Sequence, residues 1–144
     1  MSLSGAYDDD NIFARIIRGD MPSVKVWDNN DVLAFMDVFP QAPGHVLVIH
    51  KRARARNLLD IDAGDLAALM SGVQHVARAM EKALQPDGLR VTQFNGAPAG
   101  QTVFHLHVHI VPVVEGQPHR GHASGGMADM DELKAIAARI AAAA

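Results

Sequence analysis

Alternating apolar and polar positions dominate the first half of the chain and return near residue 90. Strands are predicted where the alternation has a period of two or where a short apolar run is bounded by turn residues. These segments are 24–27, 32–37, 45–50 and 89–94. Turn-forming residues at 28–31 and a proline- and glycine-containing loop at 39–44 separate the first three. Such short connections favour antiparallel neighbours.

Apolar residues recur every three to four positions in other segments, which predicts helices. A short helix over 12–17 has capping candidates at Asp8–Asn11 and ends at Gly19. A long helix begins at Asp62 or Asp65 and continues to residue 84, and a last helix follows Asp129. Because the chain contains no internal repeat and no long linker, we predict one α+β domain over 1–144. Its core is expected at 11–112, with a C-terminal loop and helix at 113–144.

Histidines alternate with apolar residues between Val103 and Val111, a pattern typical of a strand with two different faces. Leu106, Val108 and Ile110 are expected in the core. The other face would carry His105, His107 and His109 in a row, with neighbours roughly 6.5–7 Å apart. That spacing suits a phosphate held between two imidazoles. We therefore interpret the row as a site, in preference to a solvent-facing strand rich in histidine.

Two kinds of chemistry fit a row of imidazoles. Histidine pairs on strands can bind zinc in hydrolases, but the first and third residues would be about 13 Å apart, and no carboxylate follows closely. In the alternative, His107 attacks phosphorus while its neighbours hydrogen-bond the phosphate oxygens. Attack requires one ring nitrogen to be held as a donor, and a backbone carbonyl near His105 is its expected partner. Gly96 and Gly100 in the preceding loop would allow backbone N–H groups to approach the phosphate.

Composition narrows the class of protein. The 144 residues carry a net charge of −3, which gives no basic field for nucleic acid. No apolar run is long enough to span a membrane, and the N-terminus lacks the features of a signal peptide. Cysteine is absent, so disulfides and thiolate chemistry are excluded. We expect a cytoplasmic protein that binds neither membranes nor nucleic acid.

The run His105–Val111 resembles the signature of the histidine triad (HIT) family of nucleotide hydrolases and transferases, in its Hint-like branch. Gly100–Phe104, Phe35–Asp37 and Gln41–His45 match the same branch, and the similarity covers residues 11–112. The resemblance implies the HIT fold: a five-stranded antiparallel sheet with one long helix and short terminal helices. It also implies a homodimer built from the long helix and the strand at 89–94.

The resemblance implies a role for each matching position. His107 would be the nucleophile, with His105 and His109 flanking the phosphate, while His45 would support the catalytic ring and Asp37 would bind the ribose hydroxyls. The apolar residues expected to enclose the base are Ile12, Phe13, Ile16, Phe35, Val38 and Leu47. The residues expected to contact the phosphate or the leaving group are Asn95, Gln101 and Thr102.

The implied function is hydrolysis of a nucleoside 5′-monophosphate derivative, such as an AMP phosphoramidate or a dinucleoside polyphosphate, through a nucleotidyl-histidine intermediate. The partner would be a purine nucleotide or its conjugate, and no cofactor is expected. One alternative is a purine-nucleotide-binding regulatory or scaffolding protein with little turnover. A metal-dependent hydrolase is the third hypothesis.

The chain departs from the family at several positions. Many bacterial relatives hold a structural zinc through two cysteines, a histidine and the first histidine of the triad. Here the first three positions are Asn11, Ala14 and Ala53, so no zinc is expected. Thr102 stands where serine is common, which keeps the hydroxyl. His50 replaces a frequent proline, a change for which the sequence offers no reason.

Overall fold

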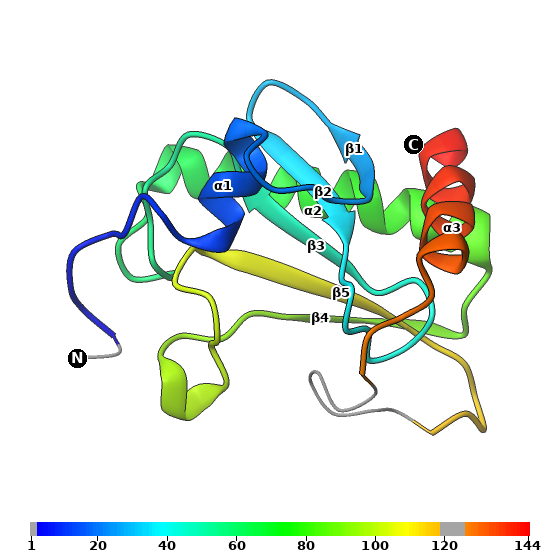
Figure 1. Cartoon of the computed structure of the whole chain (residues 1–144). Coiled ribbons are helices and arrows are strands. Elements are labelled where there is room, and N and C mark those ends of the chain that lie inside the picture. Colours follow the sequence, from blue (N-terminus) through cyan, green and yellow to red (C-terminus); the bar gives the residue numbers. More distant parts are fainter. Residues whose placement is uncertain (1–2, 119–125) are drawn as a thin grey trace.

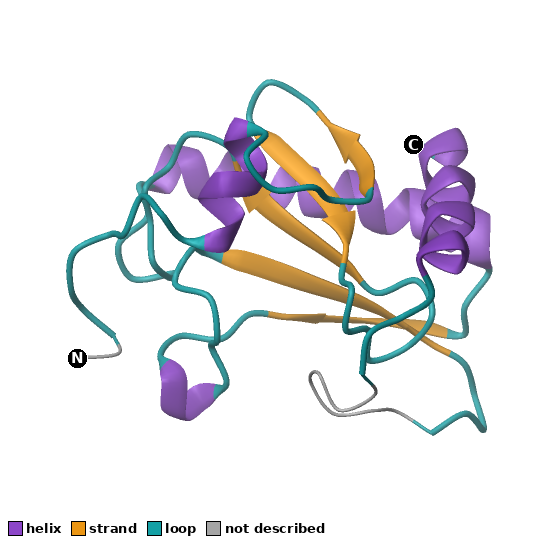
Figure 2. Cartoon of the chain, in the orientation of Figure 1, coloured by secondary structure: helices purple, strands orange, loops and turns teal. Residues whose placement is uncertain are grey.

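A computed structural model describes residues 3–118 and 126–144. The predicted strands form β1 (Lys25–Asp28), β2 (Val32–Met36), β3 (Val46–His50), β4 (Gly88–Thr92) and β5 (His107–Val113). The helices are α1 (Ile12–Arg18), α2 (Ala63–Leu84) and α3 (Met130–Ala143), and a short 3₁₀ turn, η1 (Ala97–Ala99), precedes β5. All neighbouring strands are antiparallel, in the order β1-β2-β3-β5-β4. The predicted α+β class and five-stranded sheet are confirmed (Figure 2).

Helix ends follow the predicted capping chemistry. The Asn11 side chain accepts hydrogen bonds from the backbone N–H groups of Phe13 and Ala14, and Gly19 ends α1 in a left-handed conformation. Asp62, rather than Asp65, caps α2 by accepting from the backbone of Gly64. The caps satisfy N–H groups that a helix cannot pair internally, so these ends could be predicted from local sequence.

The two faces of the sheet are covered by different helices. Even-numbered strand residues such as Val48 and Val108 join the main core beneath α2 and α3. Odd-numbered residues such as Leu47 and Ile49 join a smaller cluster with Phe13 of α1. Figure 1 shows α1 on the near face and α2 behind the sheet. The strand period of two therefore assigns each residue to one layer.

Close packing of α2 depends on Gly72. A Cβ atom at this position would lie 2.5 Å from Cγ2 of Val32, so any side chain would separate the helix from β2. This contact fixes α2 tightly against the back of the sheet. Among the described residues, no helix combines the length and the apolar character required to cross a membrane.

One boundary differs from the prediction. The strand expected from Val103 begins only at His107, because residues 103–105 form a bend. The backbone N–H of Leu106 bonds to the carbonyl of Ala55, in the connection between β3 and α2. His105 is therefore not a member of the strand, and the predicted row of three histidines on one strand is wrong.

Candidate active site

His107 and His109 lie side by side on the α1 face. The β3–β5 register places His107 opposite Ile49 and His109 opposite Leu47. Their ring centroids are 5.0 Å apart, and both residues are buried. Phe13 of α1 meets the His107 ring at an interplanar angle of 86°, with the centroids 4.9 Å apart. The alternation predicted from sequence thus holds for these two histidines.

The tautomer of His107 is set by a backbone carbonyl. Its Nδ1 lies 2.7 Å from the carbonyl oxygen of His105. A carbonyl oxygen can only accept, so Nδ1 carries the proton and Nε2 keeps its lone pair. This is the form in which imidazole acts as a nucleophile, and the predicted carbonyl partner near His105 is confirmed.

A second chain of hydrogen bonds sets the tautomers of His45 and His109. The backbone N–H of Gln41 donates to Nδ1 of His45 over 3.0 Å, so neutral His45 carries its proton on Nε2. That atom lies 3.0 Å from Nδ1 of His109 and 3.5 Å from Oδ2 of Asp37. Because Nδ1 of His109 accepts this proton, its own ring proton resides on Nε2. His109 therefore offers a hydrogen-bond donor beside the nucleophile.

A nucleophile beside a hydrogen-bond donor, each with a fixed tautomer, provides what group transfer at phosphorus requires. A model of the HIT domain matches residues 18–116. The chain belongs to the HIT family.

Two relatives of this HIT chain are named as enzymes. It is 39% identical to adenosine 5′-monophosphoramidase of Schizosaccharomyces pombe over 70% of this chain and 72% of that protein. It is 35% identical to an Arabidopsis thaliana adenylylsulfatase over 76% of this chain and 55% of that protein. A crystal structure of a Hit-like protein from Bartonella henselae is 47% identical and has a TM-score of 0.88, covering 96% of this chain and 100% of that chain.

His45 has a different partner from the one expected. Sequence comparison with the HIT family predicted that His45 supports the ring of His107, but its hydrogen bond reaches His109. The difference arises because His45 directly precedes β3 and lies beyond Val46, which pairs with Ile110. Its ring therefore lies nearer the later of the two strand histidines. Gln41, which sets the tautomer of His45, was missed as an individual residue, although the Gln41–His45 motif contained it.

Both ring nitrogens of His105 form hydrogen bonds within this HIT domain. Its Nε2 donates to the carbonyl oxygen of His50 over 3.3 Å, and its Nδ1 accepts from the hydroxyl of Tyr7 over 2.6 Å. Burial lowers the pKa of His105 to about 4, so the ring is neutral at pH 7. A phosphate would have to displace one of these partners, so the arrangement does not support the predicted contact of His105 with phosphate.

The apolar residues expected around the base separate into two groups. Phe13, Ile16, Phe35 and Leu47 come together in the cluster on the α1 face. Ile12 is 42% exposed, and Val38 packs against the opposite core.

The ring of Phe94 also lies close to His109, with their centroids 5.4 Å apart. Phe94 follows β4 and was not recognised from sequence as a site residue.

Loop residues before β5 also differ in their roles. The amide of Gln101 donates to the carbonyls of Arg56 and Val103, and its oxygen accepts from the backbone of Gly96. With both amide hydrogens engaged, buried Gln101 holds the loop and lacks a donor for phosphate. The predicted phosphate contact of Gln101 is therefore not supported. Thr102, its neighbour, is exposed.

Asn95 also joins two loops. Its side-chain oxygen accepts from the backbone of Leu58, and its amide exchanges hydrogen bonds with Gln93. These contacts connect the end of β4 to the segment before α2. Contact of Asn95 with a phosphate or a leaving group stays a prediction.

Asp37, His45 and His109 also have the composition of a metal site. Each offers one ligand atom, and the three atoms lie within 4.8 Å of one another. Binding through Nε2 of His45 would move the ring proton to Nδ1, where it would face the N–H of Gln41. Two donors would then oppose each other, so these residues do not fit a metal in the present arrangement.

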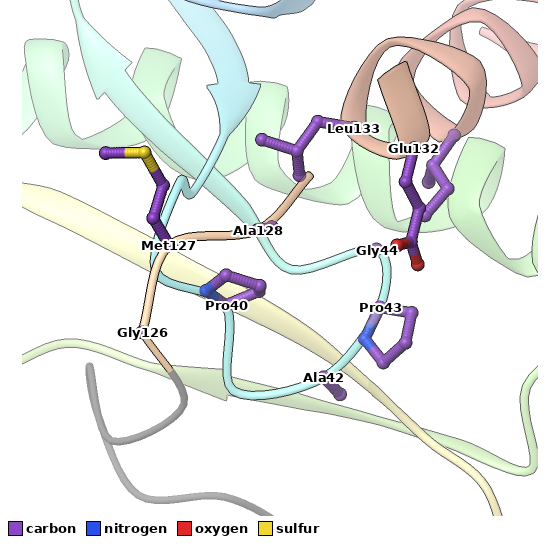
Figure 3. A pocket seen from close by; sticks show the side chains of 10 residues that line it. Pro40, Ala42, Pro43, Gly44, Gly126, Met127, Ala128, Glu132 and Leu133 are labelled. Carbon is purple, nitrogen blue, oxygen red and sulfur yellow. The ribbon is translucent and has the colours of Figure 1, made fainter. Parts of the chain in front are cut away.

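A small pocket lies behind the loop that carries Asp37 and His45. Figure 3 shows its lining residues, which come from this loop and from the beginning of α3. Its volume is ≈ 140 Å³. Glu132 is the one charged residue in its described lining, and none of the candidate site residues line it. The backbone N–H of Ala128 bonds to the carbonyl of Val38 nearby, which joins the C-terminal segment to the loop. We assign this pocket no chemistry.

Proposed function

We propose that this protein hydrolyses nucleoside 5′-monophosphate derivatives, with AMP phosphoramidates as the preferred class, through a nucleotidyl group on His107. The observation that carries the proposal is the hydrogen bond from Nδ1 of His107 to the carbonyl of His105. It leaves the nucleophilic lone pair on Nε2. The phosphoramidase and adenylylsulfatase relatives support a substrate with AMP at one end.

In the first step, Nε2 of His107 attacks the α-phosphorus and the bond from phosphorus to the leaving nitrogen breaks. The departing amine takes a proton from a solvent water, which becomes hydroxide, and it leaves as a neutral molecule. Nε2–H of His109 hydrogen-bonds to a phosphate oxygen and stabilises the charge that develops there. The intermediate is a nucleotidyl-histidine whose Nδ1–H still bonds to the His105 carbonyl. That carbonyl stabilises the positive charge on the substituted ring.

In the second step, that hydroxide attacks phosphorus and the bond between phosphorus and Nε2 of His107 breaks. AMP is released, and His107 recovers its lone pair on Nε2. His109 keeps its ring proton throughout. Its role as a donor requires its Nδ1 to remain an acceptor, which the hydrogen bond from His45 provides.

Nucleotide binding would use the surroundings of the two histidines. Phe13, Phe35 and Leu47 offer an apolar surface for the purine. Oδ1 of Asp37 accepts from the backbone of Phe39, and a carboxylate has further lone pairs for ribose hydroxyls. The exposed hydroxyl of Thr102 would contact the leaving group.

Denaturing mass spectrometry after rapid mixing with an AMP phosphoramidate tests the proposal. We expect a transient adduct of the mass of AMP on the wild-type chain, and none on the His107→Ala variant. Nucleotide binding without an adduct and without turnover would instead support the regulatory or scaffolding alternative. Turnover that is abolished by a chelator would support the metal-dependent one.

We also propose a homodimer. Strand β4 lies at the end of the sheet, where it pairs with β5 on one side, and its Val91 is 47% exposed. An apolar edge strand of this kind is suited to pairing with a second copy. Met70 on α2 is also exposed. Light scattering at micromolar concentration should give twice the chain mass, and Val91→Glu should shift it toward the monomer.

A further inference from the structure

Tyr7 is the residue outside the family motifs that contacts the histidine run most directly. Its hydroxyl lies 2.6 Å from Nδ1 of His105, although 98 positions separate the two residues in sequence. The two rings meet edge to face, with centroids 5.8 Å apart. Burial raises the pKa of Tyr7, so the hydroxyl keeps its proton at neutral pH and acts as the donor.

Two hydrogen bonds, one of them from Tyr7, hold the ring of His105. The Tyr7 hydroxyl holds one ring nitrogen, and the His50 carbonyl accepts from the other. The backbone carbonyl of the same residue accepts from Nδ1 of His107. The position and tautomer of the nucleophile therefore depend on a residue whose ring is fixed from both sides.

The residues around His105 do not fit the structural zinc that many bacterial HIT proteins bind at the corresponding positions. The side-chain oxygen of Asn11 is used in capping α1, at 3.0 Å from the N–H of Phe13 and 2.9 Å from that of Ala14. Ala14 and Ala53 carry no ligand atoms. The remaining candidate, His105, already accepts from Tyr7 through Nδ1.

A cavity remains at this place. Its volume is ≈ 140 Å³, and its lining includes Tyr7, Ala14, Ala53 and His105. If the hydroxyl were absent, Nδ1 of His105 would face this space without a fixed donor. Water could enter, but it would not hold the ring in one position as a covalently attached hydroxyl does.

We propose that Tyr7 is a positioning residue that replaces the structural metal of related HIT proteins: its hydroxyl holds His105, whose carbonyl orients His107 for attack. The catalytic part of this inference rests on the proposed function. Tyr7 is itself held by the Arg54 guanidinium, which lies 5.3 Å from the centroid of its ring and pairs with Asp9.

The test compares Tyr7→Phe with Asp10→Asn. The first removes only the hydroxyl, whereas the second weakens an exposed ion pair with Arg15 on the same N-terminal segment and should contribute little. We expect Tyr7→Phe to lower kcat for an AMP phosphoramidate about tenfold, because a small displacement of a reacting group has large kinetic effects. KM should change less than about twofold, since the nucleotide contacts are intact. Asp10→Asn should match the wild type.

A second measurement does not depend on turnover. Nitrogen-15 NMR of the imidazoles should show His105 protonated at Nε2 and His107 protonated at Nδ1 in the wild type. Tyr7→Phe should shift the nitrogen signals of His105 and speed exchange of the Nδ1 proton of His107 with solvent, whereas Asp10→Asn should change neither. Unchanged kcat and unchanged ring signals in Tyr7→Phe would overturn the proposal, as would equal losses in Asp10→Asn. If the wild type lacks turnover but Tyr7→Phe still alters both rings, the proposed function fails while the positioning role stands.

Discussion

The two faces of the central sheet are equally buried but chemically different. On the α2 face, β3 and β5 contribute mainly aliphatic side chains, such as Val48 and Val108, which are 0% and 3% exposed. The exception is His50 at the end of β3, whose Nε2 lies 3.4 Å from Oδ1 of Asp65 on α2. On the α1 face, the same strands place His107 and His109, at 6% and 1%, beside Leu47 and Ile49. Burial alone therefore does not identify the site. The difference is that the α1 face places two buried imidazoles side by side, whereas the α2 face holds a single one at the margin of an aliphatic core.

Neighbouring substitutions on opposite faces should separate activity from stability. His107→Ala removes the nucleophile and should abolish turnover, with a stability loss of about 1 kcal/mol for one hydrogen bond. Val108→Ala should cost about 2 kcal/mol through lost burial, yet keep the activity of each folded molecule. Urea unfolding and assays below the melting temperature check both. Undiminished hydrolysis by His107→Ala would contradict the assignment.

His109 provides a test of transition-state stabilisation on the same face. His109→Ala removes a donor to the phosphate and should slow turnover of an AMP phosphoramidate by about 10²–10³-fold, the scale for one transition-state donor. With a leaving group that needs no proton, such as a nitrophenolate, the defect should be similar, because the donor contacts the phosphate. Ile110→Val on the opposite face is the control, with an unchanged rate and a stability cost of about 1 kcal/mol. A defect confined to the amine leaving group would contradict this role and indicate proton donation.

Acid should lower the free energy of unfolding of the protein through the buried ring of His105. The pKa of His105 falls from an ordinary 6.5 to about 4 in the folded protein, so below pH 6.5 only the unfolded chain takes up this proton. The free energy of unfolding should therefore decrease as the pH falls from 6.5 to 4, by up to about 3 kcal/mol from this residue. Denaturant titrations across this range measure the slope. His105→Gln should flatten it, and an unchanged slope in that variant would refute the assignment.

Substitutions at the adjacent loop residues Thr102 and Gln101 should have the smallest effects, one on turnover and the other on stability. Thr102→Ala removes an exposed hydroxyl and should slow turnover about tenfold with little effect on stability. Gln101→Ala leaves the carbonyls of Arg56 and Val103 and the N–H of Gly96 without their partner, which should lower stability by about 1–3 kcal/mol. Thermal unfolding together with steady-state kinetics distinguishes the two. A rate effect confined to Gln101→Ala would reverse the roles of these two residues.

The sequence by itself determined most of the architecture. Strand alternation assigned Val108 and His107 to opposite faces, and capping residues located the ends of α1 and α2, because both signals depend on local backbone geometry. The family motifs also identified the histidine run. These features require no knowledge of which distant segments meet.

Tertiary structure alone decided how the histidines divide their roles. The bend before β5 forms where Leu106 bonds to Ala55, and it takes His105 out of the strand and toward Tyr7. His45 bonds to His109 because of where the β3–β5 pairing ends. Each of these partners is brought close only by the folded chain. A hydrogen bond between residues far apart in sequence leaves no periodic signal, so the partners of His105 and His109 could be found only in the assembled fold.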